Sequence, residues 1–208
     1  MSNENVVECG ADRKGGFIVT YSGFPYWPLD PHPNDIRIED IAHALSQICR
    51  YGGHCQTHYS VAQHCVEGSR IFEWLAELGV IPAYQALPLA RQFLLHDGAE
   101  TYIGDMVHPL KIQPELASFR NVEEINERVL SERFGLPFPY APEIKLVDNM
   151  MLAAEYKVLM RPNGSVPPFK LVEIPPYVAE RLAVVPQPAE VAKGLFIDRF
   201  KELFGDVV

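Results

Sequence analysis

The sequence predicts an all-α domain with a short β-like arm at its N-terminal end. Six segments carry apolar residues at steps of three and four, the spacing that places them on one face of a helix. Glycine and proline clusters separate these segments, and one short stretch near the start is β-like instead. The chain has 208 residues, of which 48% are hydrophobic and 22% are charged. This composition fits one globular domain with extensions and argues against an intrinsically disordered chain.

Residues 1–37 are interpreted as an N-terminal arm. The apolar and aromatic run FIVTYS, at 17–22, favours a strand or a hairpin. The stretch FPYWPLDPHPND follows it, and its prolines predict an irregular chain. Tyr26 and Trp27 in this stretch either cover a bound base or form an apolar lid over the helices.

Residues 38–160 are interpreted as a helical core. The first apolar stripe, from Ile38 to Cys49, ends at the glycine-containing break RYGGHCQ. A second break, FGLPFPYAP, precedes residue 142, and the helix before this break is expected to bury Ile125 on its core face. The expected helices of the core cover about 38–49, 59–78, 82–97, 114–134 and 142–160.

Residues 161–208 are interpreted as an extension of the core. The segment RPNGSVPPFKLVEIPPYV is rich in proline and predicts a loop, with a short extended piece at 169–172. An amphipathic helix is expected over 188–204. We expect its apolar face to pack on the bundle, with an interface between subunits as the alternative.

The charge balance restricts the partners that the protein can bind. Eighteen Lys and Arg residues against 27 Asp and Glu residues leave a formal net charge of −9. This argues against nucleic-acid polymers but not against a small anion, because one metal ion can reverse the local field. The chain lacks an apolar run long enough to span a bilayer and a signal-peptide pattern at its start, so no membrane association and a cytoplasmic location are expected. Four cysteines without a CxxC pair fit reduced thiols: Cys9, Cys49, Cys55 and Cys65.

Polar residues interrupt the apolar stripes of three expected helices. His64 follows Val61 by three residues, the pair His96-Asp97 ends an apolar run, and Asp148 follows Ile144 by four. A single histidine on an apolar face is more often a core residue than a ligand. Two imidazoles and two carboxylates on inner faces nevertheless form a mixed nitrogen and oxygen set suited to zinc or a divalent transition metal.

This ordered set resembles the HD-domain metal-dependent phosphohydrolases, whose pattern is His … His-Asp … Asp on a helical bundle. The matching stretches are YSVAQHCV, LLHDGAETYIGDMVHPLK and KLVDNMMLAAEY. The bacterial 5′-deoxynucleotidases and the phage dATP triphosphohydrolases are similar in their HDxxE, their following Gly-Asp and an Arg-aromatic pair before the first His. That pair is Arg50-Tyr51 here, and Tyr51 stands where the deoxynucleotidases carry Trp. The resemblance covers about 38–160 and implies an HD-domain helical bundle.

The resemblance and the residue chemistry together imply a catalytic centre. One divalent ion (Mn, Co, Zn, Mg, Fe or Ni) lowers the pKa of bound water, which attacks phosphorus. Glu100 lies one turn after Asp97 and is expected to orient or deprotonate that water, whereas Asp105 is expected to protonate the leaving oxygen or to support the site. For Glu100 the alternative is an exposed helix carboxylate. The expected metal ligands are His64, His96, Asp97 and Asp148.

Four further residues are candidates for substrate binding. Lys111 and Lys145 are expected to bind phosphate oxygens, and Arg50 to clamp phosphate or sugar. Tyr51 is expected to stack on sugar or base. The alternatives are solvated surface cations and a half-buried aromatic side chain. A second metal at His54 or His58 is left open, with a single metal preferred.

The expected function is hydrolysis of a (deoxy)nucleotide phosphate, with the choice between monophosphate and triphosphate left open. The alternatives are hydrolysis of another small phosphoester or a cyclic nucleotide, and a non-catalytic HD module that binds a nucleotide. The expected partner is a small phosphorylated metabolite, and the resemblance implies a homodimer or a higher homo-oligomer.

Overall fold

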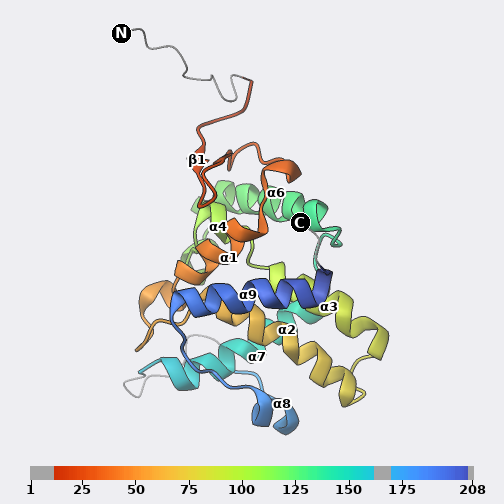
Figure 1. The fold of residues 1–208 in the computed structure, drawn as a ribbon. Coiled ribbons are helices and arrows are strands. Elements are labelled where there is room, and N and C mark those ends of the chain that lie inside the picture. The colour runs from red at the N-terminus through yellow and green to blue at the C-terminus, as the bar shows by residue number, and fades with distance from the viewer. Residues whose placement is uncertain (1–11, 162–169, 206–208) are drawn as a thin grey trace.

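Helices form the body of the protein, and a two-stranded sheet lies in the N-terminal arm (Figure 1). The computed structural model describes residues 12–161 and 170–205. The predicted all-α class with a short β arm is confirmed. In chain order the elements are β1 (Ile18–Val19), β2 (Pro25–Tyr26), η1 (Pro33–Asp35), α1 (Ile38–Gln47), η2 (Arg50–Gly53), α2 (Val61–Glu77), α3 (Ala83–Leu95), α4 (Glu100–Ile103), α5 (His108–Lys111), η3 (Pro114–Leu116), α6 (Ala117–Phe134), α7 (Pro142–Leu159), α8 (Pro176–Arg181) and α9 (Ala189–Phe204).

The N-terminal arm is fastened to the helices through Tyr26. Strands β1 and β2 pair antiparallel, with Ile18 opposite Tyr26. The Tyr26 side chain is fully buried, its hydroxyl donates to Asn126 Oδ1 at 2.6 Å, and its ring stacks on Tyr102 at 3.6 Å between centroids. Tyr26 therefore acts as an apolar lid over α4 and α6, which is one of the two roles predicted for it.

Helices α2 and α3 pack closely and form the centre of the bundle. The approach is closest at Gly68, where an added Cβ would lie 2.1 Å from the ring of Phe93. A side chain at this position would push the two helices apart, so a glycine is needed there. Ser60 caps the start of α2 by accepting a hydrogen bond from the backbone N–H of Gln63 at 3.2 Å.

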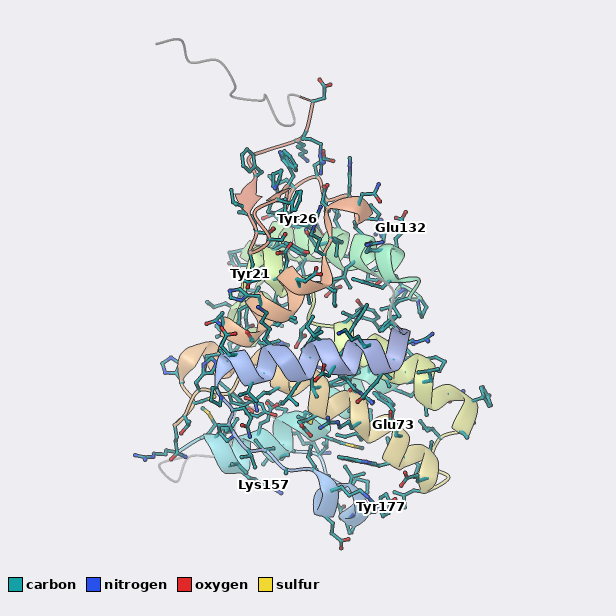
Figure 2. The ribbon with its side chains drawn as sticks, viewed as in Figure 1. Tyr21, Tyr26, Glu73, Glu132, Lys157 and Tyr177 are labelled. Atoms are coloured by element: carbon teal, nitrogen blue, oxygen red, sulfur yellow. The ribbon has the colours of Figure 1, made fainter. Side chains whose placement is uncertain are left out.

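Helix α9 returns across the bundle and packs against α1, α2 and α3 (Figure 1). Phe196, Phe200 and Leu203 on this helix are buried, which confirms the predicted packing of the C-terminal helix on the core. The nearly buried Arg199 contacts Glu73 of α2 at 2.6 Å. Figure 2 shows Glu73 beside α9, with Tyr21 and Tyr26 towards one end of the molecule and Lys157 and Tyr177 towards the other.

Several details differ from the sequence-based expectations. Ile125 is 41% exposed, while Glu123 and Asn126 of the same helix are buried, because Asn126 faces the arm. The expected extended piece begins at 169, outside the described residues, and no strand forms over the described part, 170–172. Helix α8 forms where only loop was expected. Among the described residues, no helix is both long and apolar enough to cross a membrane.

Candidate metal centre

The helices α2 and α7 and the turn after α3 bring the four predicted metal ligands into one neighbourhood. Ligand atoms of His64, His96 and Asp97 all lie within 4.8 Å of one another, close enough to hold a metal ion. Asp148 Oδ1 lies beside this group, 3.4 Å from His64 Nε2. Within 12–161 and 170–205, this is the one such group of three or more His, Cys, Asp or Glu residues.

His64 lies one turn into α2 and is completely buried. Its Nδ1 lies 2.7 Å from Glu155 Oε1, and because an ionised carboxylate only accepts, Nδ1 carries the proton. Its Nε2 is buried and makes no hydrogen bond to any described residue. Burial and the Arg50 charge lower the pKa of His64, but the facing carboxylates outweigh both and raise it to about 9. A proton or a metal ion can occupy this nitrogen.

His96 follows the last residue of α3 and is oriented by its own helix. Its Nδ1 lies 2.7 Å from the carbonyl oxygen of Phe93, which can only accept, so Nδ1 donates and Nε2 carries the lone pair. Burial lowers the pKa of His96, which favours the neutral imidazole that binds metals. The Phe93 ring lies 4.4 Å from His96 and 5.5 Å from His64 between centroids, and it supports both imidazoles.

Asp97 lies between the two histidines. Its Oδ1 is 3.2 Å from His96 Nε2, and its Oδ2 is 3.9 Å from His64 Nε2. Oδ2 is buried and accepts no hydrogen bond from the residues that the structure describes. Burial acts to raise the pKa of Asp97, but the neighbouring imidazoles and Arg50 hold it below its usual value. The ionised carboxylate therefore has an oxygen available for a cation.

Asp148 projects from α7 towards His64 and is shared with Lys145. Lys145 Nζ lies 2.6 Å from Asp148 Oδ2, and the lysine side chain is 71% exposed. Burial opposes ionisation, but the neighbouring His64, whose Nε2 lies 3.4 Å from Oδ1, holds the pKa of Asp148 well below its usual range. The carboxylate thus presents one oxygen to the centre and the other to a surface lysine.

These donors fit a divalent transition metal or zinc. Both imidazoles donate through Nδ1 and direct Nε2 to the same place, the arrangement that outer hydrogen-bond partners impose on metal-binding histidines. The buried Nε2 of His64 and Oδ2 of Asp97 lack hydrogen-bond partners in the described chain. A bound cation would satisfy both atoms, and it would also compensate the negative charge of Asp97.

Backbone pairing between the segments at Cys49 and Ser60 holds Arg50 beside the centre. Cys49 and Ser60 form an isolated antiparallel β-bridge, and the Arg50 N–H donates to the Tyr59 carbonyl at 2.9 Å. The Arg50 guanidinium lies 3.6 Å from Asp97 Oδ2 and 3.3 Å from Glu155 Oε2. The structure therefore places this predicted substrate-binding cation next to the predicted metal ligands.

Tyr51 directs its hydroxyl towards α7, where it reaches Glu155. Among the described residues it is the one non-glycine with a positive φ, at 57°, a left-handed conformation that L-residues rarely adopt. Its hydroxyl lies 3.5 Å from Glu155 Oε2 and 3.4 Å from the Leu152 carbonyl oxygen. Burial raises the pKa of the phenol, which stays protonated and donates. Stacking of this ring on a substrate stays a prediction.

Glu100 and Asp105 lie on the side of the centre formed by α4. Glu100 begins α4, and its Oε2 is buried without a hydrogen-bond partner among the described residues. Burial, reinforced by Asp97 and Asp105, raises the pKa of Glu100 well above its usual range. Asp105 is an exposed residue that follows the turn at Gly104. Its carboxyl group is nevertheless partly desolvated, and this desolvation together with the charge of Asp97 raises its pKa.

The two predicted phosphate-binding lysines are both in ion pairs. Lys111 Nζ lies 2.5 Å from Glu123 Oε1 on α6, and Lys145 is paired with Asp148 as described. Their binding to phosphate stays a prediction. His54 is exposed, and His58 Nε2 lies 3.1 Å from the Ser46 carbonyl oxygen. Neither belongs to a group of potential metal ligands in the part of the chain that the structure describes.

Sequence reasoning missed Glu155, whose side chain is fully buried at the centre. It contacts His64, Arg50 and Tyr51. A signal was present, because Glu155 follows Asp148 by seven residues, two helical turns, and interrupts the apolar run MMLAAEY. An acidic residue on the same face as an expected metal ligand indicates a buried partner rather than a solvated side chain.

Comparisons with known proteins place the chain in a family. No protein-family model matches it. The chain is 36% identical to "Uncharacterized protein YfdR" of Escherichia coli (strain K12) over 187 residues, 90% of this chain and 95% of the relative. It is 35% identical to "Uncharacterized protein RCAP_rcc00048" of Rhodobacter capsulatus over 136 residues, 61% of this chain and 64% of the relative. On the extent of the first match, the chain belongs to the same family as YfdR.

Proposed function

We propose that this protein is a divalent-metal-dependent phosphohydrolase that acts on a (deoxy)nucleotide phosphate. The observation that carries the proposal is a group of three buried polar atoms near Arg50 that lack hydrogen bonds. The three are His64 Nε2, Asp97 Oδ2 and Glu100 Oε2, and none forms a hydrogen bond with the described residues. Most buried polar atoms in proteins are hydrogen-bonded, so three such atoms near one buried cation favour a bound ligand that satisfies them. The resemblance of the motif to HD-domain phosphohydrolases supplies the reaction class.

The proposed ligands of the ion are His64, His96, Asp97 and Asp148. A divalent cation held there supplies a Lewis acid that polarises a phosphoryl oxygen and lowers the pKa of water. Glu155 and the Phe93 carbonyl keep the two imidazoles protonated at Nδ1. Each imidazole thus directs Nε2 to the proposed ion, which would take the place of the proton that His64 Nε2 carries in the metal-free protein.

Glu100 is the proposed general base. Its raised pKa, caused first by burial and then by Asp97 and Asp105, makes its ionised carboxylate a stronger proton acceptor than a solvated glutamate. Asp105 also has a raised pKa, so it is suited to carry the proton that the leaving oxygen requires. Two carboxyl groups on one side of the centre can therefore exchange protons with the attacking and leaving oxygens.

Arg50 is the proposed contact for the transferred phosphoryl group. Its planar guanidinium can bind two phosphate oxygens at once. The neighbouring Glu155 and Asp97 keep the Arg50 pKa well above its usual range despite burial, so the side chain remains cationic. A cation beside a metal site suits a small phosphate ester in a protein whose net charge is −9.

The test begins with the metal-free protein, to which Mn²⁺, Co²⁺, Mg²⁺ and Zn²⁺ are added separately. Each form is incubated with dNMPs, dNTPs and NMPs, and the phosphate species released are identified. We expect hydrolysis with at least one metal, and the product separates a monophosphatase, which releases phosphate, from a triphosphohydrolase, which releases triphosphate. Absence of turnover with every metal would contradict the proposal.

Glu100→Gln is the decisive variant, since Glu100 is not a proposed ligand. It should keep the Mn²⁺ affinity of the wild type, measured by calorimetry, and lose about 100-fold or more in kcat, the range that a general base contributes. Glu143→Gln, in the first turn of α7 and not at a proposed ligand or catalytic residue, is the matched control and should retain activity. Full activity of Glu100→Gln would remove Glu100 from the mechanism.

A further inference from the structure

Glu155 joins three functional elements at one buried carboxylate. Its Oε1 accepts from His64 Nδ1 at 2.7 Å, and its Oε2 is 3.3 Å from Arg50 Nε and 3.5 Å from the Tyr51 hydroxyl. Its side chain is 0% exposed. A fully buried carboxylate is costly, and an apolar residue would serve a purely structural role at lower cost.

We propose that Glu155 is a positioning residue that holds the metal ligand His64 and the phosphate contact Arg50 in register, so that its loss weakens metal and phosphate binding together. This inference rests on the proposed function for the role of Arg50. Glu155 lies on α7, His64 on α2, and Arg50 at the start of η2, which precedes α2. One carboxylate therefore connects parts of the site that come from separate segments of the chain.

The two oxygens of Glu155 have separate tasks. Oε1 fixes the His64 ring with its proton on Nδ1, so that Nε2 faces Asp97 and Asp148. Oε2 holds the Nε edge of the guanidinium, while an Nη atom of Arg50 lies 3.6 Å from Asp97. The guanidinium thus connects Glu155 to a proposed ligand of the ion. Rotation of the Glu155 carboxylate would displace both the imidazole and the cation.

The contact with Glu155 accounts for the left-handed backbone conformation of Tyr51. Its φ of 57° turns the chain immediately after Arg50, and its hydroxyl reaches Glu155 Oε2. A non-glycine residue keeps such a conformation only where its surroundings impose it. The contact with Glu155 and the β-bridge between Cys49 and Ser60 hold the two sides of this turn. Arg50 is consequently held on both sides, by the bridge at Cys49 before it and by the Tyr51 contact after it.

The test compares Glu155→Gln and Glu155→Leu with the matched control Glu143→Gln in the full chain. Gln keeps an acceptor for His64 but loses the charge opposite Arg50, whereas Leu loses both. We expect Mn²⁺ affinity, measured by calorimetry, to fall about 10-fold in the first and about 100-fold in the second, the range typical of residues that support metal ligands. Binding of inorganic phosphate to the Mn²⁺-loaded protein should weaken in both variants.

A spectroscopic readout separates positioning from general damage. In the Co²⁺-loaded wild type, the Nδ1 protons of His64 and His96 should give two paramagnetically shifted, slowly exchanging proton resonances. Glu155→Leu should lose the His64 resonance and keep that of His96, which donates to the Phe93 carbonyl. If Glu155→Leu does not fold, the same comparison in Glu155→Gln, where faster exchange of the His64 proton is expected, decides.

The inference is overturned if Glu155→Gln keeps its Mn²⁺ affinity within about twofold and retains both resonances unchanged. Replacing a hydrogen-bond partner of a metal ligand normally lowers metal affinity by more than that. It is also overturned if phosphate binding is unchanged while metal binding falls, since one carboxylate would then not serve both groups. A wild-type protein that binds Mn²⁺ and phosphate but hydrolyses no nucleotide would refute the proposed function and leave the role of Glu155 intact.

Discussion

The two sides of the candidate metal centre are supported in different ways. On one side, His64 of α2 is held by a carboxylate from α7, and this carboxylate also binds Arg50. On the other side, His96 is held by the carbonyl oxygen of Phe93, three residues earlier in its own chain segment. The first side exists only when α2, α7 and the loop at Arg50 have come together. The second side is formed locally by the end of α3.

This difference predicts which side of the centre loses more stability when one of its residues is replaced. A local carbonyl is present in any folded form of α3, so the His96 side depends little on distant packing. The His64 side depends on ionised groups buried together, and removal of one leaves the others without a partner. Variants on the two sides should therefore differ more in stability than in metal binding.

The largest expected effect is at Asp97, where the two sides meet. Asp97→Ala removes the carboxylate that lies beside both imidazoles, so Mn²⁺ affinity should fall by more than about 100-fold, beyond the usual cost of changing an outer partner. Calorimetry measures the loss, and activity should disappear with it. The Glu143→Gln protein provides the control for removal of one acidic group. Retained metal binding or activity would refute the proposed site.

A comparison of His64→Ala with His96→Ala tests the two kinds of support. In the metal-free protein, His64→Ala leaves Glu155 with one hydrogen-bond partner fewer and should destabilise the fold by about 3–5 kcal/mol, the cost of breaking a buried ion pair. His96→Ala removes a bond to a backbone carbonyl and should cost about 1–2 kcal/mol. Urea denaturation in the presence of a chelator measures both. Equal losses would remove the distinction between the sides.

The pH dependence of the metal-free protein sharpens the same comparison. The folded pKa of His64 is raised from 6.5 to about 9, so the folded state binds more protons between these values. Its contribution, about 3 kcal/mol, is fully present below pH 6.5 and is lost as the pH rises through 9. His96, with a lowered pKa, contributes in the opposite sense, because protonation below its unfolded pKa disfavours the fold.

A second titrating group lies in a separate pH window and provides a control. Burial raises the pKa of Glu127 to about 7, so its ionisation destabilises the fold as the pH rises from 4.5 to 7. In stability curves measured by urea denaturation at each pH, the fall in stability should therefore become smaller above pH 7 in His64→Gln and smaller below pH 7 in Glu127→Gln. A wild-type stability that does not fall between pH 7 and 9 would contradict the raised pKa of His64.

The helices and the four proposed ligands could be predicted because local patterns encode them. Apolar spacing located α1, α2, α7 and α9 to within about two residues. His64 and the His96-Asp97 pair stood out because polar residues rarely continue an apolar stripe. Their meeting follows from helices that bury the same face.

The parts that could not be predicted depend on contacts between distant segments. The face of α6 was misassigned because Asn126 is buried by the arm, 100 residues earlier in the chain. Lys145 pairs with the outer oxygen of Asp148, a contact that the sequence did not identify. Glu155 binds His64 of α2, which lies 91 residues earlier in the chain. Helical spacing does not predict a contact across such a separation.

The convergence of Asp97, Asp148 and Glu155 around one imidazole means that a cation bound at the proposed site would stabilise the folded state. All three carboxyl groups have lowered pKa values and are ionised, so a cation that enters binds the folded chain far better than the unfolded one. By mass action, such a ligand adds about 2.7 kcal/mol of stability at a hundredfold excess over its Kd. The melting temperature of the protein is therefore a direct report of which metal the site selects. In the cell, metal supply would set not only how fast the protein works but also how much of it survives proteolysis.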